Sequence, residues 1–98
     1  MVLRLRIMGL QIKIRTLGYL EDLLDRELEV NVNATSVLDL IMELAKLKGF
    51  KPSEILDSLR DEDYLLLLNG RSVNYDMLKK TKLRSGDVVV FMPVVSGG

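Results

Sequence analysis

The chain begins with two stretches in which apolar and polar residues alternate, residues 3–7 and residues 10–15. A period of two is typical of a β-strand with one solvated face. The apolar residues occupy odd positions in the first stretch and even positions in the second, so a bulge, turn or break is needed at Met8-Gly9. Residues 1–8 are therefore either an N-terminal extension or an extra edge strand, and the first core strand starts near Gly9.

Residues 28–32 alternate in the same way and predict a second strand. A different period follows, because apolar residues then recur at intervals of three and four, which predicts a helix covering a sheet. Ser36 with Asp39 resembles a capping box, Thr35 is a competing cap, and Gly49 ends the helix. The apolar stripe consists of Val37, Leu40, Ile41, Leu44 and Leu47.

A shorter helix is predicted over residues 53–59, started by Pro52. Tyr64 to Leu68 is then predicted to form a strand. Asn69-Gly70 strongly indicates a hairpin turn into a short return strand. The last strand, Val88 to Met92, is apolar throughout, so we expect it at the centre of the sheet, parallel to the first core strand. Pro93 lacks an N–H donor, so regular pairing is expected to stop there.

This order of elements predicts an α+β fold, the β-grasp or ubiquitin-like fold, with a mixed sheet packed on one main helix. The β-grasp domain spans residues 9–92, and residues 93–98 form an extended Gly-Gly tail.

Composition narrows the possible functions. Fourteen basic residues balance fourteen acidic ones, which argues against nucleic acid or an anionic membrane as partner. The chain has no cysteine and no histidine, so it lacks a thiolate nucleophile, the usual general base and the commonest metal ligands. We therefore expect a protein that is not an enzyme and binds no metal or cofactor. No apolar run is long enough to cross a membrane, and the alternating N-terminus is unlike a secretory signal, so we expect a cytoplasmic protein.

The tail is apolar and uncharged, which is unusual for a segment exposed to water. Residues 93–98 can reach about 20 Å beyond the sheet when extended. Glycine has no Cβ, so Gly97 and Gly98 suit a narrow channel in which the terminal carbonyl stays open to attack. We expect the carboxylate of Gly98 to react while the preceding residues enter a partner protein: Pro93, Val94, Val95, Ser96 and Gly97.

Five segments together resemble the ubiquitin-like sulfur carriers of the MoaD/ThiS family, from about Gly9 to the last residue. Met92-Pro-Val-Val-Ser-Gly-Gly98 is the most specific of them. The molybdopterin branch of the family typically ends in Pro-Pro-Val-Ser/Ala-Gly-Gly, and Val94 stands where the second proline is usual. The other four segments are Lys13-Ile-Arg-Thr-Leu-Gly18, Ala34-Thr-Ser-Val-Leu-Asp-Leu40, Leu68-Asn-Gly-Arg71 and Leu83-Arg-Ser-Gly-Asp87.

The resemblance implies a reaction and its partners. An adenylating activating enzyme of the MoeB/ThiF type would use ATP to adenylate Gly98, and a sulfur donor would displace AMP to leave a thiocarboxylate. The tail would then enter a MoaE-like large subunit of molybdopterin synthase. Three alternatives remain: a sulfur carrier for the thiamine pathway, a protein modifier conjugated to lysines through Gly98, and a passive interaction module.

The ubiquitin-like alignment also predicts a docking surface. Tyr64 to Leu68 and Val88 to Met92 are apolar on both faces, whereas a sheet with helices on one side normally alternates. Exposed apolar patches of this kind usually mark interfaces. Either the patch is open, or residues 1–7 or the second helix cover it. Its residues are Leu65, Leu67, Val90 and Met92, while the helix side takes Tyr64, Leu66, Leu68, Val89 and Phe91.

Overall fold

The computed structural model describes residues 9–95. The predicted N-terminal extension or edge strand, residues 1–8, and the last tail residues, Ser96, Gly97 and Gly98, lie outside the described residues.

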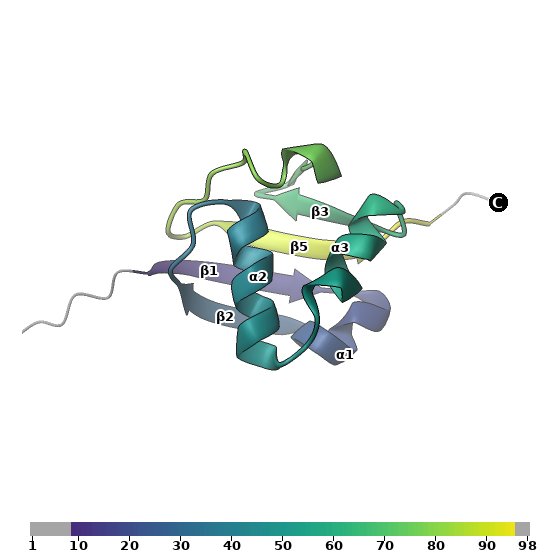
Figure 1. The fold of residues 1–98 in the computed structure, drawn as a ribbon, viewed down its shortest axis with the longest axis horizontal. Helices are drawn as coiled ribbons and strands as arrows, with labels where there is room; N and C mark the ends of the chain where they lie inside the picture. Colours follow the sequence, from purple (N-terminus) through teal and green to yellow (C-terminus); the bar gives the residue numbers. More distant parts are fainter. Residues whose placement is uncertain (1–8, 96–98) are drawn as a thin grey trace, which may run out of the picture.

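A five-stranded sheet forms one layer of the molecule, in the order β2-β1-β5-β3-β4 (Figure 1). Strand β5 lies parallel to β1 and antiparallel to β3, which confirms the prediction of a mixed sheet with the last strand at its centre. The strands are β1 (Leu10–Thr16), β2 (Glu27–Val32), β3 (Tyr64–Leu68), β4 (Arg71–Ser72) and β5 (Val88–Pro93).

The alternation near the start of the chain produces the hairpin of β1 and β2. Ile12 lies opposite Val30 and Ile14 opposite Leu28, and both isoleucines are only 1% exposed. Each contributes about 1.5–3 kcal/mol by leaving water. The residue between them, Lys13, is exposed on the other face of the sheet, so the two faces differ sharply in polarity.

Two helices cover the face of the sheet that carries Ile12 and Ile14, namely α2 (Val37–Lys48) and α3 (Pro52–Arg60) (Figure 1). The short helices η1 (Gly18–Leu20), α1 (Glu21–Leu24) and η2 (Tyr75–Met77) lie in the connections. Most of the predicted stripe of α2 is fully buried, namely Val37, Leu40, Ile41 and Leu44. Leu47 was wrongly placed in the stripe, because Ala45 joins the core in the last turn and Leu47 is 62% exposed.

The start of α2 is capped from two positions. The Ser36 hydroxyl accepts a hydrogen bond from the Asp39 N–H at 3.1 Å, as the sequence predicts for an N-cap. The Asp39 carboxylate accepts bonds from the N–H and the hydroxyl of Thr35, at 3.4 and 2.9 Å. The bond from the Thr35 hydroxyl is the main cause that lowers the pKa of Asp39. Both candidate caps therefore contribute, linked through one carboxylate.

We expect Asp39→Asn to lower the free energy of unfolding by about 0.5 kcal/mol at neutral pH, the low end for a hydrogen bond because Asp39 is exposed. Since the folded state depresses the pKa of Asp39, this stability is present above the unfolded pKa and is lost as pH falls through the folded pKa. Urea unfolding of both proteins from neutral to acid pH should show the difference vanishing at the acid end. A difference that persists unchanged there would contradict this account of the cap.

The predicted hairpin turn is confirmed. Asn69 and Gly70 have φ of 51° and 88°, the two positive values that a type I′ turn requires. The side-chain carbonyl of Asn69 also accepts a hydrogen bond from the Val88 N–H at 2.9 Å, and its amide donates to Asp87 at 2.9 Å. The turn thus fastens the β3–β4 hairpin to the start of β5.

Strand β5 continues one residue further than predicted. Pro93 belongs to the strand and lies opposite Tyr64 of β3. The Val94 N–H bonds to the Asp63 carbonyl at 2.9 Å, which identifies Tyr64–Pro93 as a pair that exchanges no hydrogen bond of its own. The nitrogen of Pro93 faces away from β3, toward the segment after β1, so its missing donor removes no bond from the β3–β5 ladder.

Candidate functional site: an open apolar face and the root of the tail

The four predicted patch residues come together on the sheet face opposite the helices. Leu65 lies opposite Met92, and Leu67 opposite Val90, in the register of β3 and β5. Leu65 is 40% exposed and the other three are half-buried. Their neighbours along the strands are buried against the helices, namely Tyr64, Leu66, Val89 and Phe91, while Leu68 is half-buried against the same core.

The second helix does not cover this patch. Ile55 and Leu59 of α3 belong to the core on the other side of the sheet, where α2 also packs (Figure 1). Residues 1–7, the other proposed cover, lie outside the described residues. Within residues 9–95, the patch is open.

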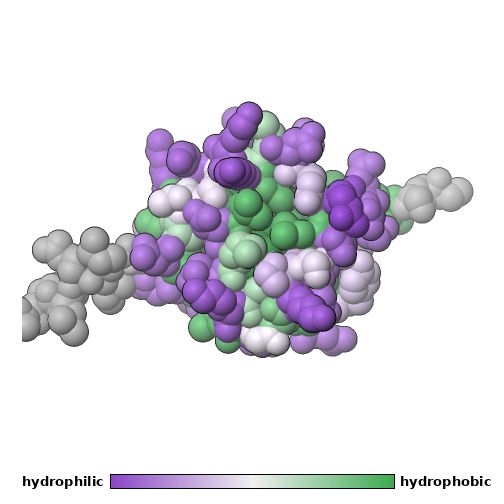
Figure 2. All heavy atoms as spheres, viewed as in Figure 1, coloured by the Kyte–Doolittle hydropathy of each residue, from purple (hydrophilic) through white to green (hydrophobic). Residues whose placement is uncertain are grey.

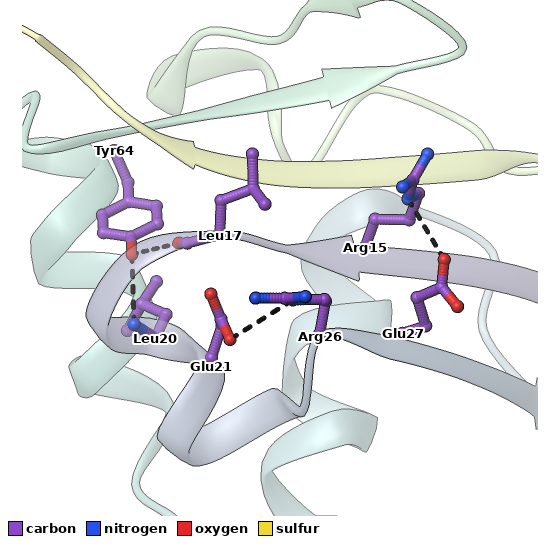
Figure 3. A network of polar contacts seen from close by, with 7 residues as sticks. All are labelled: Arg15, Leu17, Leu20, Glu21, Arg26, Glu27 and Tyr64. Atoms are coloured by element: carbon purple, nitrogen blue, oxygen red, sulfur yellow. Dashed lines mark hydrogen bonds and ion pairs between the residues drawn. The ribbon is translucent and has the colours of Figure 1, made fainter.

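Charged residues border the patch on the same face. Arg15 lies beside Val90, and Glu27 lies beyond it on β2. Arg15 and Glu27 form an ion pair at 3.6 Å, with both side chains more than 60% exposed, so it adds little stability (Figure 3). A hollow of about 540 Å³ lies over this border, lined by residues that include Lys13, Arg15, Glu27, Glu29 and Val88. The open face therefore changes from apolar through basic to acidic across the sheet.

The helix-bearing face has a different character. Figure 2 shows a hydrophobic area near its middle, interrupted and surrounded by hydrophilic residues. Met42 of α2 is 43% exposed, close to the exposure of Leu65 on the opposite face. The open patch differs in that Met92 directly precedes Pro93, so the patch lies beside the root of the tail.

The tail leaves the sheet from a fixed root. On one side, the Val94 N–H bonds to the Asp63 carbonyl, and on the other, the Leu17 N–H bonds to the Phe91 carbonyl, both at 2.9 Å. Beyond this point Val94 is 41% and Val95 84% exposed. The fold therefore leaves two apolar side chains of the tail in water, available for burial against a partner.

The hydroxyl of Tyr64 joins this root to the loop after β1, a role that the sequence pattern did not reveal. It donates to the Leu17 carbonyl and accepts from the Leu20 N–H at 3.0 Å (Figure 3). Burial raises the pKa of Tyr64, so the hydroxyl keeps its proton and remains a donor. Alternation placed Tyr64 on the helix side, but no pattern along the chain indicates where a hydroxyl will find its partners.

Two further observations concern the described residues. No three carboxylate side chains among residues 9–95 lie close enough together to hold a metal ion. In that same part of the chain, no helix has the length and hydrophobicity needed to cross a membrane.

The ThiS family model matches residues 14–98, which is most of the chain and includes the whole tail. The chain belongs to the ThiS family. This confirms the resemblance to ubiquitin-like sulfur carriers. A relative from Archaeoglobus fulgidus, named "Putative sulfur carrier protein", is 34% identical over 74 residues, which cover 74% of this chain and 84% of the relative.

Solved structures confirm the β-grasp fold of this ThiS-family chain. A Pyrococcus furiosus protein described as a "Putative molybdopterin converting factor, subunit 1" has a TM-score of 0.64 and 26% identity, covering 89% of this chain and all of that one. Small archaeal modifier protein 1 of Haloferax volcanii has a TM-score of 0.66 at 18% identity, again covering 89% and 100%. A chain from the complex of subunits 1 and 2 of the Helicobacter pylori molybdopterin-converting factor has a TM-score of 0.57 at 20% identity, covering 91% of this chain and 100% of that one.

Proposed function

We propose that this sulfur carrier serves molybdopterin synthesis as the small subunit of molybdopterin synthase, with the carboxylate of Gly98 as its reacting group. The match to the ThiS family through Gly98 is the observation that carries this proposal. The Pyrococcus furiosus relative, described as subunit 1 of a molybdopterin converting factor, supports the choice of pathway. The chain acts as a carrier, and the catalytic groups belong to its partners.

The proposed reaction has two steps. A carboxylate oxygen of Gly98 attacks the α-phosphorus of ATP, which releases pyrophosphate and leaves an acyl-adenylate. A sulfide equivalent from a sulfur donor then attacks the carbonyl carbon, and AMP leaves with the C–O bond electrons to give the thiocarboxylate. The sequence contains no Gly-rich phosphate-binding loop, so ATP would bind to an activating enzyme of the MoeB/ThiF type.

In this proposal the tail binds inside a channel of the partner, while the open face docks on the partner's surface. Pro93 and Val94 start the tail in an extended direction, and Val94 and Val95 offer apolar surface to the wall of a channel. Ser96 and Gly97 would continue this channel segment up to Gly98. Glycine at positions 97 and 98 allows close approach of other groups to the reacting carbonyl. Docking of the patch would bring the tail root to the mouth of the channel.

We assign the patch on the open face to the partners of both reactions. The activating enzyme and a MoaE-like large subunit would each bind Leu65, Leu67, Val90 and Met92. The Helicobacter pylori chain of the same fold belongs to a complex of subunits 1 and 2 of a molybdopterin-converting factor, which is the kind of assembly proposed for this chain.

A reconstitution tests the pathway. The thiocarboxylated chain is mixed with a purified large subunit of molybdopterin synthase and the sulfur-free pterin precursor. We expect dithiolene product to form as thiocarboxylate is consumed, and neither change without the large subunit. Consumption only with a thiazole synthase would assign the chain to the thiamine pathway. Lysine-linked conjugates in cell extract, without pterin product, would identify a protein modifier.

A further inference from the structure

Two backbone segments flank the end of β5. The segment before β3 holds Val94 through the Asp63 carbonyl, and the segment after β1 holds Phe91 through the Leu17 N–H. These two segments are far apart along the chain and meet at the point where the tail begins. We call the four-residue stretch from Leu17 to Leu20 the flanking loop.

Tyr64 connects the two segments. Its side chain is 1% exposed, and Tyr64 lies opposite Pro93 in the sheet. Its hydroxyl donates to the first residue of the flanking loop, Leu17, and accepts from the last, Leu20 (Figure 3). One phenol oxygen thus closes both ends of this loop onto β3.

Gly18 allows the flanking loop to lie against the tail root. Its φ of 79° is in the left-handed region that favours glycine. A Cβ at this position would be 3.2 Å from Cγ of Pro93 and would collide with the Tyr64 hydroxyl. The loop backbone, the proline ring and the phenol therefore pack without room for a side chain.

We propose that Tyr64 is a positioning residue for the tail: its hydroxyl holds the flanking loop against Pro93, so that the tail leaves the sheet along the line of β5. We call the two hydrogen bonds of this hydroxyl, to Leu17 and Leu20, the lock. The functional part of this inference rests on the proposed function. A tail that already points in its bound direction loses less conformational entropy when it enters the activating enzyme. Loosening the root therefore weakens productive binding and leaves the chemical step unchanged.

The test compares Tyr64→Phe with two controls in the full chain. Tyr19→Phe removes a hydroxyl from within the flanking loop, whose partner is Ser58 of α3 at 3.1 Å, and keeps both hydrogen bonds of Tyr64 and the edge-on contact of the two rings. Ile55→Val trims the buried core on α3 and lowers stability without touching the root. The measurements are the backbone ¹H–¹⁵N NOE of Val94 in the free chain, and ATP–pyrophosphate exchange by the activating enzyme at varied carrier concentration.

We expect Tyr64→Phe to lower the Val94 NOE and raise KM about 5-fold with kcat unchanged, the pattern for lost binding that is equal in ground and transition states. Neither control should change the NOE or KM. Gly18→Ala, which pushes the loop away from Pro93, should act like Tyr64→Phe.

Four results would overturn the inference in whole or in part. An unchanged Val94 NOE in Tyr64→Phe refutes the lock, whatever the enzyme assay shows. A lowered NOE with unchanged KM refutes the positioning role, and so does an equal rise in KM for Ile55→Val. If the unaltered chain supports no exchange at all, the proposed function has failed and the positioning role fails with it, while the NOE still decides whether the lock exists.

Discussion

Deleting Gly98 lowers the rate of adenylation by the activating enzyme by about 100-fold or more and leaves the fold unchanged. The deletion exposes a new carboxylate on Gly97, which is chemically the same group but lies about 3.3 Å short of its place. A displacement of even 1 Å from a reacting geometry can cost about 100-fold in rate. The measurement is ATP–pyrophosphate exchange with each tail variant at saturating carrier.

Two further tail variants distinguish the effect of moving the terminal carboxylate from the effect of changing the residues of the tail. Adding one glycine after Gly98 displaces the carboxylate by the same distance in the other direction, so the rate should fall to a similar extent. Ser96→Ala keeps the length and should retain most of the activity. If the shortened and lengthened tails reacted as fast as the natural one, Gly98 would not be the group that the partner positions.

Replacing Leu65 by aspartate weakens binding to the activating enzyme and to the large subunit by at least about 10-fold. Burying a leucine side chain contributes about 1.5–3 kcal/mol, and a carboxylate placed in an apolar interface also has to lose its water. Leu65 is 40% exposed in the free chain, so the substitution removes little of the core. Isothermal titration of each partner gives Kd directly.

Met42→Asp is the matched control for the docking surface. Met42 is apolar and 43% exposed, but it lies on α2, on the opposite face of the sheet. The Met42→Asp substitution should leave Kd unchanged for both partners. An equal loss of affinity for Leu65→Asp and Met42→Asp, or a loss for Met42→Asp alone, would contradict the assignment of the open face.

Much of the fold could be read from local patterns. The alternation in β1 and β2, the stripe of α2 and the Asn69-Gly70 turn each depend on a few neighbouring residues, and each appears where it was expected, except that Leu47 of the stripe is exposed. The central place of β5 followed from its uniformly apolar composition. The boundary at Pro93 was wrong by one residue, because whether a proline breaks a ladder depends on which side of the strand its nitrogen faces.

The tail root is the part of the site that local patterns could not provide. The lock formed by Tyr64 joins residues 44 and 47 positions apart along the chain, so no periodicity reports it. Gly18 gave a partial signal, since an isolated glycine at a strand end often marks a close approach of backbone. The glycine does not reveal which ring or hydroxyl it approaches, and that partner depends on the register of β3 against β5.

The intact mass of the chain after incubation with the activating enzyme, ATP and a sulfur donor tests the central claim most directly. The account predicts a mass gain equal to the replacement of one oxygen by one sulfur, located on Gly98 by fragmentation, and dependent on ATP. No change in mass, or a sulfur atom located on any other residue, would contradict the account.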